Sequence, residues 1–131
     1  MTSATRFPAP LLRDDEPTTL VTTPLAYGYL RVPADVPDYR VRRVEQAVTR
    51  FAASKGLYFV SFFFELDCGS REGFEELITE LVRAEAHHVV VPSLRHLALN
   101  ELLRTAMREQ LALEANAQVH PVGRRTGEAL A

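Results

Sequence analysis

Short apolar runs alternate along the chain with longer segments in which apolar residues recur every three or four positions. Short apolar runs bounded by turn residues are typical of buried strands, and the longer period is typical of amphipathic helices. The first run, residues 25–33, is almost entirely apolar until it ends on an arginine, a valine and a proline. We therefore predict a buried strand there, around which the rest of the domain is arranged.

Three helices are predicted between and after the strands. The first follows a turn at residues 34–37, with Asp38 as N-cap, and runs to about residue 55 with an arginine-rich outer face. The second follows Ser70, a candidate cap, and the third runs over residues 97–114. The apolar stripe predicted for the second helix is Phe74, Leu77, Ile78, Leu81 and Val82. The broad side predicted for the third is Leu99, Leu102, Leu103, Ala106, Met107, Gln110 and Leu111.

Three further strands complete the pattern. Residues 57–64 are aromatic and β-branched with little polar alternation, which predicts a strand covered on both faces. Residues 88–91 form a third strand that stops at Pro92, and residues 118–122 form a weak fourth. Strands separated by helices of this length imply right-handed crossovers and parallel pairing. We predict an α/β fold in three layers, with a mainly parallel four- to five-stranded sheet and helices on both faces.

The chain divides into three regions by composition. Residues 1–24 hold four prolines and several threonines, which predicts a disordered arm. Residues 25–122 form the predicted domain, and residues 123–131 form a polar, flexible tail.

Charge and composition are those of an ordinary globular domain. The chain has 131 residues, 47% hydrophobic and 24% charged, with a net charge of −2. That length fits one domain, and the charge gives no global attraction to nucleic acid or membrane. The single cysteine, Cys68, excludes an internal disulfide and fits the cytoplasm, which is the location we expect. We see no apolar run long enough to span a bilayer and no signal peptide.

Three stretches in register resemble the catalytic domain of the serine recombinases, the resolvase/invertase family. Residues 28–33, Gly-Tyr-Leu-Arg-Val-Pro, are similar to that family's opening Gly-Tyr-x-Arg-Val-Ser. Residues 70–77 resemble its Arg-x-Gly-(apolar)-x-x-Leu segment at the head of the second helix. Residues 89–99 lie where the family has an apolar strand followed by Leu-Asp-Arg-Leu-x-Arg. The resemblance covers about residues 25–122 and implies a resolvase-like fold.

The resemblance also implies a chemistry. In that family a serine hydroxyl attacks a DNA phosphodiester and forms a covalent phosphoserine link, and several arginines stabilise the charge on phosphorus. Arginine suits this task because its planar guanidinium binds phosphate oxygens in pairs and keeps its charge. Two positions of this chain, Arg31 and Arg71, match family arginines.

Four other catalytic positions have changed. Pro33 stands where the nucleophilic serine belongs, Arg95 replaces the aspartate, and His96 and Leu99 replace arginines. Proline has no group that can attack phosphorus. The family also continues into a long helix and a DNA-binding domain, whereas nine residues follow Val122 here. We therefore expect a stand-alone domain that is catalytically inactive.

Other nucleophiles and metal ligands have simpler interpretations. Cys68 fits a small loop residue, Ser70 a helix cap and Ser93 a turn hydroxyl, and no acid–His–nucleophile set is apparent from the spacing. His87 and His88 are adjacent, so on a strand they point to opposite faces, and the remaining histidines, His96 and His120, are single.

We therefore predict no metal site. The first strand is followed by neither glycine-rich phosphate motif, so no nucleotide cofactor is expected. Prolines end the first and third strands, where a phosphoacceptor receiver domain would need acidic residues.

The function predicted from the sequence is binding rather than chemistry. Arg31, Arg71, Arg95 and His96 are expected to converge at the carboxyl edge of the sheet, where they could hold an anion such as a DNA phosphate, weakly. The opposite interpretation is that these cations are solvated or paired with nearby carboxylates. We expect a homo-oligomer or a protein partner, and no membrane. Two alternatives stay open: an active DNA strand-exchange enzyme or a subunit of one, and a dimerising scaffold that associates through an exposed helix face.

Overall fold

The computed structural model of this chain describes residues 23–66 and 71–123. Its elements follow one another in the predicted β-α-β-α-β-α-β order, with one 3₁₀ helix added before the last α-helix. They are β2 (Leu25–Val32), α1 (Asp38–Ser54), β3 (Tyr58–Leu66), α2 (Glu72–Ala84), β4 (His88–Val91), the 3₁₀ helix η1 (Leu94–His96), α3 (Glu101–Ala115) and β5 (Gln118–Pro121).

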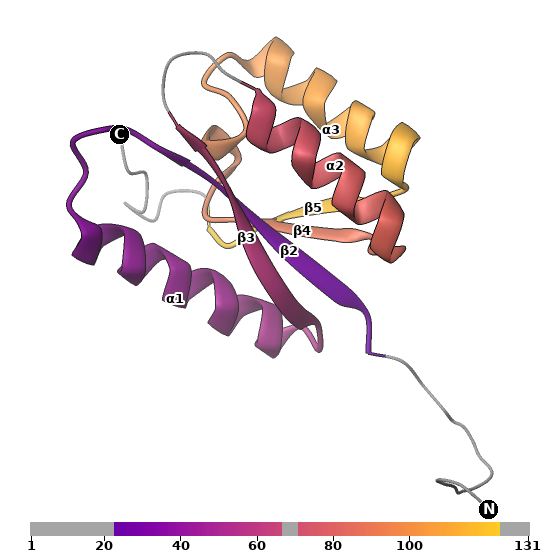
Figure 1. Ribbon diagram of the computed structural model, residues 1–131, viewed down its shortest axis with the longest axis horizontal. Helices are drawn as coiled ribbons and strands as arrows, with labels where there is room; N and C mark the ends of the chain where they lie inside the picture. Colours follow the sequence, from indigo (N-terminus) through magenta and orange to yellow (C-terminus); the bar gives the residue numbers. More distant parts are fainter. Residues whose placement is uncertain (1–22, 67–70, 124–131) are drawn as a thin grey trace, which may run out of the picture.

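The four strands form one parallel sheet in the order β3-β2-β4-β5. Helix α1 lies on one face of the sheet, and α2 and α3 lie together on the other (Figure 1). The predicted α/β class, the parallel pairing and the three layers are confirmed. Strand β2 has a neighbour on each side, so its carboxyl end lies at the middle of the sheet edge.

The core divides into two clusters, one on each face of the sheet. On the α1 face, alternate residues of β2 pack against one side of that helix; the members are Ala26, Leu30, Val44, Val48, Ala52 and Val90. The larger cluster joins the other face of β2 to α2 and α3, with Tyr29, Phe74, Leu77, Leu81, Met107 and Leu111 among its buried members. Of the stripe predicted for the second helix, only Val82 is exposed.

The prediction that residues 57–64 are covered on both faces is wrong. Strand β3 lies at the edge of the sheet, and Tyr58, Val60 and Phe64 are exposed along it. Its aromatic residues give β3 the sequence typical of a central strand. The sequence pattern shows how apolar a strand is, whereas the crossovers decide its place in the sheet.

The third helix begins later than predicted, and its broad apolar side is only partly buried. Asn100 caps α3 by accepting a hydrogen bond from the backbone N–H of Leu103, so the helix starts at Glu101. Buried positions of α3 are Met107, Leu111 and Ala115. Leu99, Leu102 and Leu103 are 66%, 82% and 41% exposed.

Smaller differences concern caps and ends. Asp38 is the first residue of α1; Pro37 precedes it as N-cap, without a side-chain hydrogen bond. Ser70, most of the predicted arm and most of the predicted tail lie outside the described residues. Within residues 23–66 and 71–123, we find no helix of the length and apolarity that a bilayer crossing requires.

Candidate functional site

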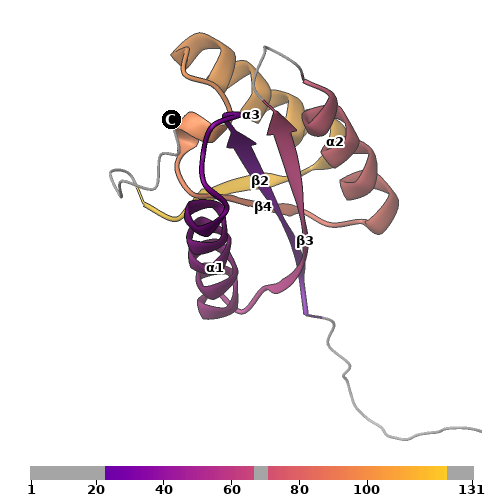
Figure 2. The same cartoon turned by 60° about the vertical axis from the view of Figure 1, so that its left-hand side comes forward.

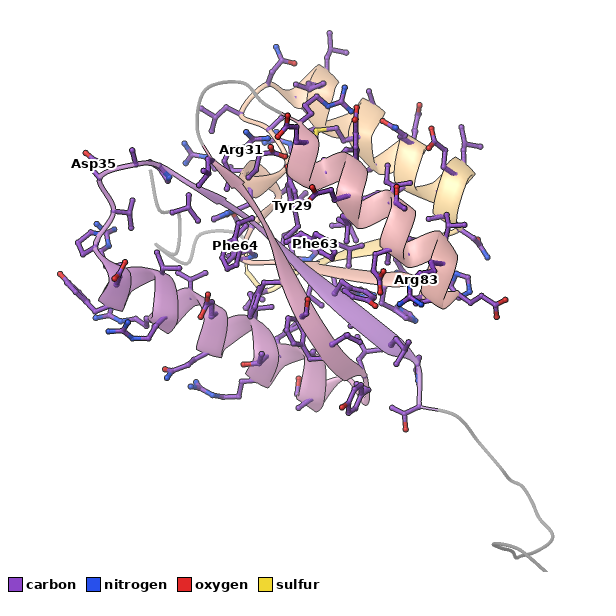
Figure 3. All side chains as sticks on the ribbon, in the orientation of Figure 1. Tyr29, Arg31, Asp35, Phe63, Phe64 and Arg83 are labelled. Atoms are coloured by element: carbon purple, nitrogen blue, oxygen red, sulfur yellow. The ribbon has the colours of Figure 1, made fainter. Side chains whose placement is uncertain are left out.

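The candidate site lies where β2 ends, on the side of the sheet that α2 and α3 cover. Tyr29 and Arg31 are two residues apart on the strand, so their side chains leave the same face. Figure 3 shows both beside the first turn of α2, whereas Asp35 lies on the loop that leads to α1. The strand therefore brings a phenol and a guanidinium to one edge of the sheet.

A buried carboxylate, Glu65, lies at the centre of the site. It is 2% exposed although it belongs to an edge strand. Its oxygens accept hydrogen bonds from the hydroxyl of Tyr29 at 2.7 Å and from the backbone N–H groups of Gly73 and Phe74 at 3.2 and 3.0 Å. The N–H groups at a helix N-terminus attract negative charge, so Glu65 binds the start of α2 as an anion would.

Gly73 allows this contact. A Cβ atom at residue 73 would lie 2.5 Å from the carbonyl oxygen of Phe64 and 3.2 Å from a carboxylate oxygen of Glu65. Only glycine lets the first turn of α2 approach β3 so closely. The glycine of the Arg-Glu-Gly segment thus has a structural role in joining α2 to the carboxylate.

The phenol of Tyr29 stays protonated in this environment. Burial raises its pKa far above the usual value, and the hydrogen bond to Glu65 and the charge of that carboxylate raise it further. The charges of Arg31 and Arg71 act in the opposite direction. Both arginines are therefore near enough to the same hydroxyl to influence its titration.

Neutral acceptors hold the two guanidinium groups. Arg31 donates to the carbonyl oxygen of Leu97 at 2.9 Å and, at the long distance of 3.5 Å, to the hydroxyl of Tyr29. Arg71 donates to the side-chain oxygen of Gln110 on α3 at 3.0 Å and lies 5.4 Å from the ring centre of Phe74.

The ion pair found in residues 23–66 and 71–123 joins Arg83 to Glu80 and involves neither Arg31 nor Arg71. Arg83 lies toward the other end of α2 (Figure 3). The Nε atoms of Arg31 and Arg71 are buried and have no hydrogen-bond partner within the described parts of the chain. Buried side-chain donors without a partner are rare in folded proteins.

His96 joins the site through the backbone of Arg31. Its Nδ1 atom accepts the N–H of Arg31 at 3.1 Å, and the residue is 4% exposed. Accepting at Nδ1 places the ring proton on Nε2, so His96 is a hydrogen-bond donor on its other side.

The other predicted positions lie around this group without joining it. Arg95 is exposed, and Leu99 is exposed beyond η1. Pro33 is half-buried in the turn after β2, where its carbonyl accepts the N–H of Val36 at 3.3 Å. The structure thus brings together Arg31, Arg71 and His96.

Three members of the site were missed by sequence reasoning. Glu65 could have been identified from the sequence, because it is the one charged residue in the apolar run of β3. Gln110 was assigned only to the broad side of the third helix, and Arg104 gave no signal, because no local pattern shows what either side chain contacts. Arg104 donates to the carbonyl oxygen of Ala98 at 3.3 Å, next to the carbonyl that holds Arg31, and so adds a third guanidinium to this edge.

Other candidate residues have separate places. The Ser93 hydroxyl is buried and has no hydrogen-bond partner among the described residues, and Cys68 lies outside them. The prediction that His120 is single is wrong, because its Nε2 lies 3.0 Å from Nδ1 of His88 on the neighbouring strand. His87 instead contacts backbone carbonyls at the end of α3. No group of three or more metal-ligating side chains occurs in residues 23–66 and 71–123.

Comparison with known proteins finds similarity among solved structures. No protein-family profile matches the sequence, and no curated protein matches it. Among solved structures, the chain is similar to the C-terminal catalytic domain of ISC1926 TnpA, an IS607-like serine recombinase, with a TM-score of 0.65 and 16% sequence identity. The match covers 77% of this chain and 72% of that one. At this identity the similarity establishes the fold, which is that of a serine recombinase catalytic domain.

Proposed function

We propose that this chain binds a phosphate group of nucleic acid at the site of Arg31 and Arg71 and does not cleave it. The observation that carries the proposal is the hydrogen bonding of the two guanidinium groups. Each donates to a neutral acceptor, and the buried Nε atom of each has no hydrogen-bond partner among the described residues. A phosphate oxygen is the acceptor that an arginine fork fits best.

The charges around the site favour an anion. Glu65 is the carboxylate hydrogen-bonded within this group, and its charge is already met by the Tyr29 hydroxyl and the start of α2. The nearby cations, Arg31, Arg71 and Arg104, are not neutralised by it. In a half-buried position their attraction for an anion is screened less than at the surface.

Within residues 23–66 and 71–123, neither Pro33, Tyr29 nor His96 supplies a nucleophile at the anion site. Pro33 has no reactive group, and the Tyr29 hydroxyl is a poor nucleophile because its pKa is raised and its proton is donated to Glu65. His96 cannot take a proton at Nε2 while Nδ1 accepts the N–H of Arg31. These observations favour binding over phosphoryl transfer.

The second candidate function is DNA strand exchange, by this chain or by an assembly that contains it. Its support is the fold, which is shared with the catalytic domain of a serine recombinase, together with the paired arginines. It requires a nucleophile in place of Pro33, and the buried hydroxyl of Ser93 is the candidate that the described residues offer.

Binding of a labelled DNA duplex over a range of salt concentrations tests the proposal. We expect salt-dependent retention that Arg31→Gln and Arg71→Gln each weaken, with the log–log slope falling by about 0.9 for each phosphate that the variant no longer neutralises. Glutamine removes the charge and keeps a polar side chain with hydrogen-bond donors, so we expect both variants to fold. Arg95→Gln is the matched control, an exposed cation at the same edge that should change binding little.

Two outcomes would contradict the proposal. Unchanged retention in Arg31→Gln and Arg71→Gln would show that the site does not hold the phosphate. A DNA adduct that survives denaturation would establish covalent chemistry, and its disappearance in Ser93→Ala would identify the nucleophile.

A further inference from the structure

We propose that the exposed side of α1 binds the sugar-phosphate backbone of nucleic acid through a row of three arginines, Arg40, Arg43 and Arg50. We call these residues the arginine row. Helix α1 lies on the opposite face of the sheet from α2 and α3, which enclose the anion site (Figure 1). The inference therefore stands on other residues than the proposed function, although the class of ligand is the same.

The arginine row follows one side of its helix. Residues three, four or seven positions apart are neighbours on a helix surface, and Arg40, Arg43 and Arg50 are separated by three and seven. All three residues are exposed. Figure 2 shows α1 by itself on one side of the strands, with α2 and α3 on the other. No other helix of the described chain therefore covers the row.

Carboxylates do not neutralise the arginine row. The two acidic residues of α1, Asp38 and Glu45, are seven positions apart and lie along another flank of the helix. Arg42 lies between them, at distances of four and three residues where opposite charges attract. Arg40 and Arg43 are also three apart, but as like charges they repel. Within the described parts of the chain, no ion pair involves a member of the row.

The positive charge of the domain is concentrated on this helix. Helix α1 has four arginines and two carboxylates, whereas α2 has four glutamates and one arginine, and α3 has three glutamates and two arginines. The net charge of −2 therefore conceals a basic face and an acidic face on opposite sides of the sheet. Arginines gathered along one side of a helix are the electrostatic signature of a surface that binds nucleic acid.

The length and chemistry of the row fit a phosphate backbone. Residues 40–50 extend over about 15 Å of helix, a length along which one strand of DNA carries about four phosphates. Tyr39, which is 59% exposed, and the exposed Gln46 each lie one turn from Arg43. Both are side chains that also donate hydrogen bonds to phosphate oxygens. Backbone contacts carry no base information, so we expect binding without sequence preference.

A second copy of this chain is the competing partner, because the acidic side of α2 has the complementary charge. Such a contact would join different surfaces of the two copies, since α1 and α2 lie on opposite faces of the sheet. Contacts of that type do not close into a dimer and instead continue into rings or filaments. A nucleic acid backbone meets the same charge without this requirement, so we favour it.

Retention of a labelled DNA duplex over a range of salt concentrations tests the arginine row. The slope of log affinity against log salt should fall by about 0.9 in Arg43→Gln and by about 2.7 in the triple variant Arg40→Gln/Arg43→Gln/Arg50→Gln. The matched control is Arg42→Gln, which removes the same charge from the neighbouring exposed position and should change the slope little. Arg43→Lys keeps the charge and should keep the slope. Melting temperatures check that the variants fold.

Three outcomes would overturn the proposal. Equal effects of Arg42→Gln and Arg43→Gln would show that DNA responds to the total charge of the helix instead of to the row. Unchanged retention by the triple variant would show that the row does not contact the backbone. If sedimentation velocity showed that this variant had lost only self-association, the row would bind a second copy.

The two DNA surfaces can be separated by the same measurement. Reduced retention in the α1 variants, with Arg31→Gln and Arg71→Gln unchanged, would support the arginine row and contradict the anion site. The reverse pattern would contradict the row and leave the anion site standing. A natural chain that is not retained even at low salt would contradict both.

Discussion

Glu65 is a single residue whose burial costs free energy and whose hydrogen bonds join β3 to β2 and α2. A buried carboxylate is stable only when hydrogen bonds replace its water, and this one has three donors. Glu65→Gln should lower the free energy of unfolding by about 2 kcal/mol, because the amide NH₂ meets donors where the carboxylate accepted bonds. Urea unfolding measures the change.

The control for that variant is Glu109→Gln, a charge removal at an exposed position of α3, which should shift stability by no more than about 0.5 kcal/mol. Equal stability of the two variants would mean that the Glu65 carboxylate contributes nothing through its hydrogen bonds.

Single residues were predictable where a motif fixed them. Arg31 and Arg71 stand in segments with a recognisable spacing, and the structure places both beside Tyr29. Arg95 was grouped with them, but the 3₁₀ turn of η1 leaves it exposed while His96 turns inward. Gln110 could not be foreseen, because its role depends on how α3 packs beside α2, which no local pattern encodes.

Gly73 decides the position of a whole helix. Gly73→Ala adds a Cβ atom that would lie 2.5 Å from the carbonyl oxygen of Phe64, so the first turn of α2 must move away from β3 and from Glu65. Although alanine is the better helix former, we expect a loss of about 2 kcal/mol in unfolding free energy from this steric conflict.

Chemical denaturation of Gly73→Ala should be compared with Thr79→Ala, an exposed change on the same helix that should be neutral or slightly stabilising. If Gly73→Ala proved as stable as the natural chain, the close approach of α2 to β3 would not be a constraint on the fold.

The helices and strands were largely predictable from the sequence, but the position of each element in the fold, and so its exposure, was not. The periodicity of residues 38–55 and 72–84 identifies α1 and α2 because one side of each helix is buried. The same reasoning assigned too much of α3 to the core, since exposed leucines repeat there at helical spacing. Strand β3 shows the same limit: its sequence is that of a central strand, and its edge position follows from the topology of the crossovers.

For the whole molecule, the pairing of His88 with His120 links stability to pH. The pKa of each histidine is lowered, chiefly by burial and also by nearby positive charge: that of His87 acting on His88, and those of His88 and Lys55 acting on His120. Above about pH 6.5 neither the folded nor the unfolded chain protonates these rings. Below it the unfolded chain binds protons that the folded chain does not, so stability should fall as the pH falls.

The hydrogen bond between the rings adds to this effect, because one of the two facing nitrogens, 3.0 Å apart, must accept, and two protonated rings in this position would repel. Thermal melts between neutral and mildly acidic pH should show the loss of stability in the natural chain and a flatter profile in His120→Gln. His87→Gln is the comparison, since that ring contacts the carbonyls of Ala115 and Asn116 instead of the pair, and most of the acid sensitivity should persist. A profile in His120→Gln as steep as that of the natural chain would assign the acid sensitivity to other groups.

Because β5 pairs only with β4 in the described sheet, the first region to open in acid should be that edge, which hydrogen exchange in residues 118–121 would reveal.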